Sequence, residues 1–254
     1  MIPNTLRLPE RPPRPRATGV TVVIDNGLPR GLFRDHLESA VDLVDFVKFG
    51  WGTPLVTAQL PEKIAVLQEL GVPFFFGGTL FEKYLSRSQF DDFRAFCHQW
   101  GCRYVEVSNG TIDLPNDEKA RYVDKLVGEF TVFSEVGLKD SARSESQTAE
   151  DWVQFIRQDL EAGAAFVVAE ARESGRSGIC RPDGGLRQEF VEGILRAGPD
   201  VERMVFEAPT KELQTWFVRR VGSNVNLGNI APGDVLGLET LRLGLRSDTL
   251  LLWS

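Results

Sequence analysis

Residues 166–178 read Phe-Val-Val-Ala-Glu-Ala-Arg-Glu-Ser-Gly-Arg-Ser-Gly, a short apolar run followed by a charged loop that contains glycines. The apolar part, Phe166 to Ala169, is typical of a strand buried on both faces, as the strands of parallel sheets are. The abrupt change to charged residues at Glu170 is typical of a strand that ends at the active face of a barrel or open sheet. A strand followed by a solvated loop would give the same pattern, so this segment alone leaves both interpretations open.

Three other segments have the same form, a short apolar run with a glutamate and then a turn residue. They are Val105-Glu106-Val107-Ser108-Asn109-Gly110, Phe133-Ser134-Glu135-Val136-Gly137 and Val205-Phe206-Glu207-Ala208-Pro209. The carboxyl ends of parallel strands meet at one face of a sheet or barrel. We therefore expect the glutamates at 106, 135, 170 and 207 to form one site.

Strand patterns alternate with helix patterns along the whole chain, and no two strands are close enough for a hairpin. The connections must therefore be crossovers and the sheet parallel. The expected strands are Val20–Ile24, Phe46–Phe49, Phe74–Phe76, Tyr104–Val107, Thr131–Ser134, Phe166–Ala169, Met204–Phe206 and Asn224–Leu227. Eight such units in 254 residues predict a (β/α)8 TIM barrel of class α/β. A doubly wound sheet is the alternative, but no Gly-x-Gly-x-x-Gly motif follows any strand.

Two intervening segments are assigned by the same patterns. We expect one helix from about Leu80 to Gln99, and a polar loop from Asp140 to Gln147 before the next helix. Residues 1–18 are expected to form an arm rich in proline and arginine, and residues 19–254 the barrel. The arm lacks the apolar core of a signal peptide. We expect it to lie extended across the barrel or a neighbouring subunit, rather than to act as a targeting or anion-binding tail.

Composition limits the class of protein further. The formal charge of −7 and the pI near 5.1 disfavour a nucleic-acid binder, because phosphate contacts need a basic face. No apolar run approaches the ~18 residues that span a membrane. The odd number of cysteines, three, without metal-type spacing, indicates a reducing, cytoplasmic setting. We also expect a homo-oligomer.

The expected strand ends carry a ring of polar side chains at what would be the barrel mouth. The alternative is that they pair as salt bridges and only fill the mouth. The ring comprises Asp25, Lys48, Thr79, Glu106, Ser108, Glu135, Lys139, Glu170, Arg172, Glu207, Asn226 and Asn229.

The chemistry open to this ring is narrow. Both histidines, His36 and His98, fall in expected helices of the outer layer, which disfavours imidazole catalysis and a histidine-bound metal. Carboxylates without histidine or thiolate suit Mg²⁺, a hard ion with oxygen ligands, and we expect Glu135, Glu170 and Glu207 to supply them. Lysines beside a metal-bound carboxylate substrate can move protons at carbon. Glycine-rich turns at residues 50–52, 175–178 and 228 can present N–H groups to a phosphate.

Seven segments, and nearly the whole chain from about Gly19 to Thr249, resemble the phosphosulfolactate synthase family, which includes heat-stress-associated relatives. The segments are Val47–Thr53, Gly77–Glu82, Ser134–Gly137, Ala171–Gly175, Phe206–Pro209, Asn224–Ile230 and Leu238–Thr249. The resemblance implies a Mg²⁺-dependent carbon–sulfur lyase with a (β/α)8 barrel. Such an enzyme adds sulfite to phosphoenolpyruvate to give (2R)-phospho-3-sulfolactate in coenzyme M biosynthesis.

The resemblance also implies roles for individual residues. Lys139 is the expected acid that protonates carbon, Lys48 the second choice and Glu106 a third catalytic residue, and either lysine would serve better with a lowered pKa. Asn26 stands where the family usually has a lysine, which leaves the substrate open. The alternatives are a non-catalytic or differently active relative of the heat-tolerance branch, or another reaction on a phosphorylated small acid. The expected substrate-binding residues are Asp25, Arg172, Ser174, Gly175, Asn226, Gly228 and Asn229.

Overall fold

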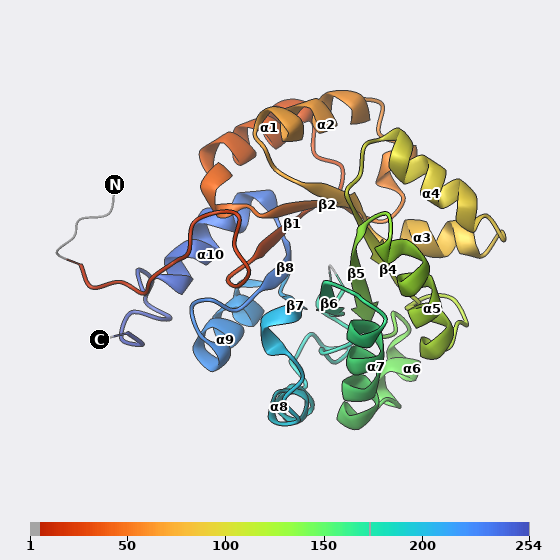
Figure 1. Cartoon of the computed structure of the whole chain (residues 1–254). Helices are drawn as coiled ribbons and strands as arrows, with labels where there is room; N and C mark the ends of the chain where they lie inside the picture. Colours follow the sequence, from red (N-terminus) through yellow and green to blue (C-terminus); the bar gives the residue numbers. More distant parts are fainter. Residues whose placement is uncertain (1–5, 173, 254) are drawn as a thin grey trace.

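The computed structural model describes residues 6–172 and 174–253 and is a (β/α)8 TIM barrel, with parallel strands surrounded by helices (Figure 1). In space the strands follow the order β3-β2-β1-β8-β7-β6-β5-β4. The two outer members of this order, β3 and β4, lie side by side and bring the sheet round to an almost closed barrel. The strands are β1 (Thr21–Asp25), β2 (Phe46–Phe49), β3 (Phe74–Phe76), β4 (Tyr104–Val107), β5 (Thr131–Val136), β6 (Phe166–Ala169), β7 (Met204–Glu207) and β8 (Leu227–Ile230).

Helices form the outer layer. Short 3-10 turns η1 (Val41–Leu43), η2 (Thr53–Leu55), η3 (Val201–Arg203) and η4 (Pro232–Asp234) join some of them to the strands. The helices are α1 (Arg30–Ser39), α2 (Leu60–Glu69), α3 (Gly78–Leu85), α4 (Phe90–Gln99), α5 (Asn116–Val127), α6 (Ser141–Glu145), α7 (Ala149–Glu161), α8 (Gln188–Arg196), α9 (Lys211–Val221) and α10 (Val235–Arg242). Helix α7 shows how local sequence determines a helix and the face that it buries. Thr148 and Asp151 form a capping box at its amino end, and Trp152 and Ile156 on one face are fully buried.

The structure corrects three of the expected boundaries. The single helix expected over residues 80–99 is two helices, α3 and α4, because Ser88 takes a positive φ of 57° between them. The expected loop after Asp140 contains α6, whose first turn is capped by the Asp140 carboxylate. The last strand begins at Leu227 and not at Asn224, which shifts every later residue of that strand relative to the mouth.

The barrel interior is layered along the strands. Phe46, Phe75, Phe133, Val168 and Val205 form a buried apolar cluster inside the barrel, with the Phe75 and Phe133 rings stacked at 4.7 Å. Side chains two residues apart on a strand point to the same face. In four of these strands the residue two places beyond the apolar one is charged: Lys48, Glu135, Glu170 and Glu207. The same step carries β4 from Tyr104 to Glu106. An apolar layer therefore supports a charged layer at the carboxyl end.

The amino-terminal arm crosses the other end of the barrel, where the strands begin. Arg11 donates to the Glu239 carboxylate at 2.9 Å and to the Gly19 carbonyl at 3.0 Å. Arg16 forms an ion pair with Asp45 at 3.1 Å, with both side chains almost fully buried. Arginine side chains, rather than strand pairing, thus hold the arm against the barrel. In the part of the chain that the structure describes, no helix is long and apolar enough to cross a membrane.

Candidate active site

The carboxyl ends of the strands hold a buried cluster of charged side chains around one small cavity. The four glutamates expected there, at positions 106, 135, 170 and 207, all line this cavity, and each is at most 2% exposed. Lys48, Thr79, Lys139, Arg172 and Asn229 line it as well. The structure thus brings together the charged residues that the strand-end pattern singled out, with the exception of Asp25.

Lys48 is at the centre of the carboxylates. Its Nζ lies 2.9 Å from Glu106 Oε1, 3.3 Å from Glu207 Oε1 and 3.7 Å from Glu135 Oε2. Burial alone would lower the pKa of Lys48, but these three carboxylates raise it well above its usual range. Lys48 is therefore held as a fixed ammonium group.

Lys139 approaches the same carboxylates from the loop after β5. Its Nζ lies 3.2 Å from Glu135 Oε1, 3.9 Å from Glu170 Oε2 and 3.2 Å from Thr79 Oγ1. Burial would lower the pKa of Lys139, but Glu135 and Glu170 outweigh it and raise the pKa. Neither lysine therefore has the lowered pKa that would favour proton transfer. Each is an ammonium group over the whole neutral range.

A fifth carboxylate, Glu82, belongs to the cluster and was missed in the sequence. It lies on α3, and its Oε2 accepts hydrogen bonds from the Thr111 and Ile112 amides at 2.8 and 3.0 Å. Its Oε1 accepts from Ser108 Oγ and lies 3.5 Å from Lys139 Nζ. The search for strand-end residues passed over Glu82 because it is on a helix. It follows Thr79 by three residues, a spacing that puts both on one helix face.

The carboxylates have different protonation states although they are neighbours. Burial, only partly offset by Lys48, raises the pKa of Glu106 to about 7. Burial and the charges of Glu135 and Glu207 raise the pKa of Glu170 well above its usual range. Burial would also raise the pKa of Glu135, but Lys139 and Lys48 hold it well below the usual range. The shift favours the ionised form of Glu135 and the protonated form of Glu170.

The donor set fits a hard divalent cation at Glu135 and Glu170. Oε2 of Glu170 is buried and accepts no hydrogen bond, and the acidic side chains of the cluster outnumber its cations. Both oxygens of Glu106 and of Glu207 are already used, by Lys48 together with the backbone amides of Gly78 and Ala171. No three acidic, histidine or cysteine side chains converge as a ready metal cage among the described residues. The cation would therefore keep several waters, as Mg²⁺ commonly does.

Three expected substrate-binding residues are placed elsewhere. Asp25 faces the helical layer, where its carboxylate pairs with Lys63 of α2 and accepts the Gly27 and Leu28 amides. Asn226 precedes β8 at the amino end of the barrel and bonds the backbone of Val20 and Met204. Gly228 is inside β8 and not in a turn, and an added Cβ would lie 3.1 Å from Val205. Placing these residues at the mouth was therefore wrong.

The other expected substrate-binding residues lie on two mouth loops. Arg172 and Asn229 line the cavity, and both have a positive φ, of 57° and 55°. Asn229 reaches the mouth because the pairing of β8 with β1 shifts register there, and its buried Oδ1 has no hydrogen-bond partner. Ser174 is exposed, and Gly175 packs near Leu213 and Pro209, so neither lines the cavity.

The mouth cavity is small. Its volume is about 20 Å³, enough for about one water molecule. Trp51 and Arg172 lie on its rim in left-handed backbone conformations that side-chain-bearing residues seldom adopt. A phosphorylated acid can therefore bind only after rim side chains move outward.

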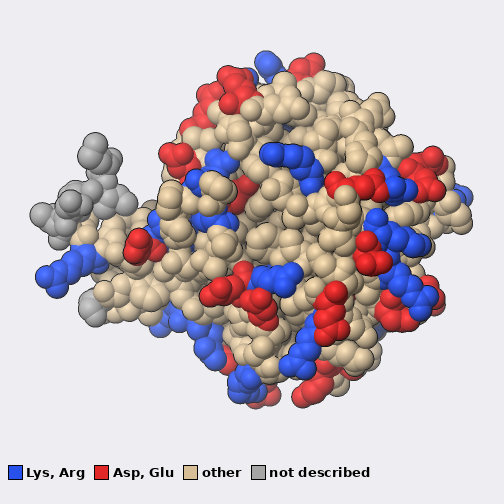
Figure 2. All heavy atoms as spheres, in the orientation of Figure 1, with Lys and Arg blue, Asp and Glu red and all other residues tan. Residues whose placement is uncertain are grey.

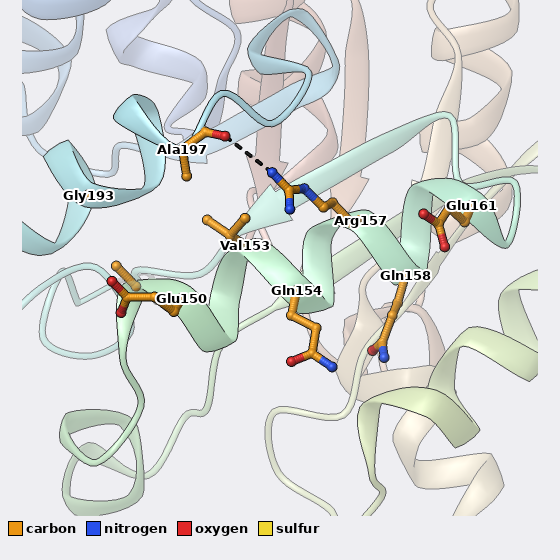
Figure 3. A pocket seen from close by; sticks show the side chains of 9 residues that line it. Glu150, Val153, Gln154, Arg157, Gln158, Glu161, Gly193 and Ala197 are labelled. Carbon is orange, nitrogen blue, oxygen red and sulfur yellow. Dashed lines mark hydrogen bonds between the residues drawn. The ribbon is translucent and has the colours of Figure 1, made fainter.

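The larger cavities elsewhere lack a buried cluster of lysines and carboxylates. A groove of about 540 Å³ lies between α7 and α8, with Val153, Gly193 and Ala197 along it (Figure 3). Arg157 of this groove donates a hydrogen bond to the Ala197 carbonyl at 3.2 Å. Figure 2 shows acidic and basic side chains interspersed over the face in view, with no broad basic area. The mouth is thus the cavity whose side chains are suited to catalysis.

A (β/α)8 barrel with lysines among carboxylates at the carboxyl ends of its strands has the architecture of an enzyme active site. Residues 9–248 match the family described as (2R)-phospho-3-sulfolactate synthase (ComA). The chain is 50% identical over 248 residues to phosphosulfolactate synthase of Bacillus subtilis, covering 98% of each protein. This protein therefore belongs to the phosphosulfolactate synthase family.

The chain is also similar to one more distant relative in sequence and to a solved structure in fold. It is 26% identical to the protein heat-stress-associated 32 of Arabidopsis thaliana, over 92% of this chain and 88% of that protein. Among solved structures, 3-hexulose-6-phosphate synthase of Salmonella typhimurium aligns with a TM-score of 0.52 and 13% identity. That alignment covers 88% of this chain and 98% of the other. The structural likeness confirms the barrel fold and carries no statement about substrate.

Proposed function

We propose that this protein is an active phosphosulfolactate synthase that adds sulfite to phosphoenolpyruvate and gives (2R)-phospho-3-sulfolactate. The observation that carries the proposal is the contact of Lys139 with Glu135 and Glu170 in the mouth, two carboxyls whose pKa values are shifted in opposite directions. The full-length match to the family and the 50% identity to the Bacillus subtilis enzyme support it.

The substrate is a trianion at most, and the cationic and amide groups of the mouth would hold it. Arg172 is on the rim, and its Nη1 donates to the Lys139 carbonyl at 3.4 Å, so outward movement of Arg172 frees a guanidinium group for the phosphate. The side chain of Asn229 also lines the cavity. Lys48 is buried below and faces the carboxylate end of a bound substrate.

The reaction needs one proton at carbon, and Lys139 is placed to give it. The sulfur lone pair of sulfite forms a bond to the terminal carbon of phosphoenolpyruvate, and the electron pair of the double bond moves toward the carboxylate. The Lys139 ammonium then donates its proton to the adjacent carbon and takes another from solvent. Its raised pKa means that the donor form is fully populated before the reaction.

Mg²⁺ at Glu135 and Glu170, when bound, supplies positive charge next to the substrate carboxylate on which negative charge develops. Lys48 acts on the same carboxylate as a buried, fixed ammonium group. Ser108 holds the Glu135 carboxylate in place through a hydrogen bond of 2.9 Å. These groups are in position before substrate binds, which reduces the reorganisation that the reaction requires.

The second candidate is a relative without synthase activity, of the heat-tolerance type. The 26% identity to the Arabidopsis protein and Asn26 in place of the family lysine are the observations that favour it. Asn26 is exposed and does not line the cavity, so the buried charge cluster is complete without a lysine there. An interaction protein has no use for so many buried charges, which are costly to desolvate. We therefore prefer the synthase.

Purified protein that is incubated with phosphoenolpyruvate, sulfite and Mg²⁺ should form a product with the mass of phosphosulfolactate. Mass spectrometry detects this product. Omission of sulfite is the matched control and should leave phosphoenolpyruvate unchanged. Absence of the sulfonated product from a folded, Mg²⁺-supplied preparation would exclude the synthase. Consumption of phosphoenolpyruvate without sulfite would instead indicate another reaction on the same acid.

A further inference from the structure

A second cavity lies at the end of the barrel opposite the mouth. It has a volume of about 560 Å³ and is formed between the arm and the beginnings of β2, β3 and β4. Phe46 and Tyr104, the first residues of β2 and β4, line it. Two residues further along these strands, Lys48 and Glu106 line the mouth. The two cavities are therefore on opposite sides of the apolar layer, and nothing in the proposed reaction uses the second one.

Arginine side chains give this second cavity a positive charge. Arg14 donates to the carbonyls of Val41 and Gly71, which satisfy its N–H groups without neutralising its charge. Arg103 is exposed, and no salt bridge or side-chain hydrogen bond to it is found within the described residues. The lining carboxylate, Asp45, is already paired with Arg16. Arg14 and Arg103, neither in an ion pair within the described residues, thus border one cavity in a chain whose net charge is −7.

Two aromatic rings and neighbouring aliphatic side chains supply the apolar part of the lining. The rings of Phe46 and Tyr104 meet edge to face with centroids 5.0 Å apart, and Leu70 and Pro73 lie beside them. A guanidinium group binds phosphate oxygens in a bidentate manner and also stacks on planar rings. The volume is within the range of ~300–1,000 Å³ typical of small-molecule sites. An aromatic ring that carries a phosphate group would match both halves of the lining.

We infer that the amino-end cavity is a binding site for a small aromatic phosphate, separate from the site at the mouth. The phosphate contacts Arg14 and Arg103, and the ring lies on Phe46 and Tyr104. Because Arg14 and Pro15 belong to the arm, the bound ligand also fastens the arm to the barrel. This inference does not depend on the proposed synthase reaction.

Phenyl phosphate is the probe, and its binding is measured by isothermal titration calorimetry. Arg103→Gln removes an exposed side chain and should weaken binding by about 10- to 100-fold, the effect of one charged hydrogen-bonding partner. Arg196→Gln, an exposed arginine on α8, is the matched control and should bind as the wild type does. Phenol and inorganic phosphate, each lacking one half of the probe, should both bind more weakly than phenyl phosphate.

A mouth variant separates the two sites. Arg172→Ala should keep its affinity for phenyl phosphate, because Arg172 is at the other end of the barrel. The inference is overturned if Arg172→Ala loses binding while Arg103→Gln keeps it, since the probe then occupies only the mouth. Equal affinities of Arg103→Gln and wild type would overturn it as well.

Limited trypsin digestion gives an independent readout. Arg11 and Arg14 precede prolines and resist trypsin, so Arg7–Leu8 and Arg16–Ala17 are the cleavable bonds of the arm. Phenyl phosphate should slow cleavage after Arg16 in the wild type but not in Arg103→Gln. Cleavage after Arg7, outside the cavity lining, should be unchanged. Equal rates after Arg16 with and without the probe would contradict a ligand that fastens the arm.

Discussion

The Nζ atom of Lys139 lies 3.2 Å from Oε1 of Glu135, four residues before it in the chain at the end of β5. The intervening Gly137 has a φ of 135°, and an added Cβ there would lie 2.6 Å from the Glu170 side chain. Only glycine allows the chain to turn so closely over the cluster. The backbone of one short segment thus sets both the ionised carboxylate and the lysine that faces it.

Lys139→Ala should lower kcat by about 10²–10⁴-fold, the range for loss of a positioned acid. The fold should survive, because the Lys139 side chain is 19% exposed and its removal leaves no large cavity. Steady-state kinetics on the mass-spectrometric assay measures the effect. A variant that keeps the wild-type kcat would show that the proton comes from another group, and Lys48 would be tested next.

Arg172→Ala should raise KM more than it lowers kcat, because Arg172 contacts substrate without giving a proton. Its backbone has a positive φ of 57°, which alanine tolerates no worse than arginine, so the loop should keep its shape. The split between KM and kcat distinguishes this anion contact from the role of Lys139. A fall in kcat alone would move Arg172 into the chemical step.

Much of this site follows from the period of two along a strand. Phe133 and Glu135, or Val205 and Glu207, are separated by one residue, so burial of the first in the barrel brings the second to the mouth. Sequence therefore predicts both the barrel and the meeting of its glutamates.

The same reasoning failed where the pattern does not fix the register. The last strand, Leu-Gly-Asn-Ile, has no apolar alternation to show which residue faces inward, and its pairing with β1 is irregular. Asn226 and Asn229 were both expected at the mouth, and of the two only Asn229 lines the cavity there. Glu82 was missed because it reaches the cluster from a helix. The raised pKa of both lysines depends on distances to several carboxylates, which no single segment encodes.

The raised pKa of Glu106 gives a pH-dependent stability. A carboxyl whose pKa is about 7 in the folded protein binds its proton more tightly there than in the unfolded chain. Its contribution to the free energy of unfolding therefore falls as the pH rises from about 4.5 to 7. Glu106→Gln cannot ionise and should lose this part of the dependence. Between pH 5 and 8 its free energy of unfolding should rise relative to wild type by up to about 3 kcal/mol. Urea unfolding in EDTA at both pH values measures it, and parallel pH profiles would contradict the assignment.

Mg²⁺ should displace the proton of Glu170. Burial and the charges of Glu135 and Glu207 raise the pKa of Glu170, and a cation bound between Glu135 and Glu170 would lower it again. Calorimetric titration of Mg²⁺ in two buffers of different ionisation enthalpy should therefore show proton release. EDTA should abolish activity and Mg²⁺ should restore it. Glu170→Gln should bind Mg²⁺ weakly and release no proton.

Activity that is unchanged in EDTA would contradict the metal proposal. So would Mg²⁺ binding of equal strength in wild type and Glu170→Gln. Glu192→Gln is the matched control for the calorimetry, because Glu192 is on α8, pairs with Arg220 and is remote from the mouth. It should bind Mg²⁺ and release protons as the wild type does.

Deletion of residues 1–16 should destabilise the barrel without preventing its folding. It removes Arg11, Arg14 and Arg16, and so leaves Asp45 and Glu239 without their arginine partners in the arm. A buried pair that loses one partner typically costs about 3–5 kcal/mol, although water will reach Asp45 once the arm is gone. We expect Tm to fall by about 5–10 °C, measured by circular dichroism. Deletion of residues 1–8, which keeps all three arginines, should leave Tm unchanged. If the longer deletion yields no cooperatively folded protein, the arm belongs to the core; if Tm does not change, the arginine contacts contribute no net stability.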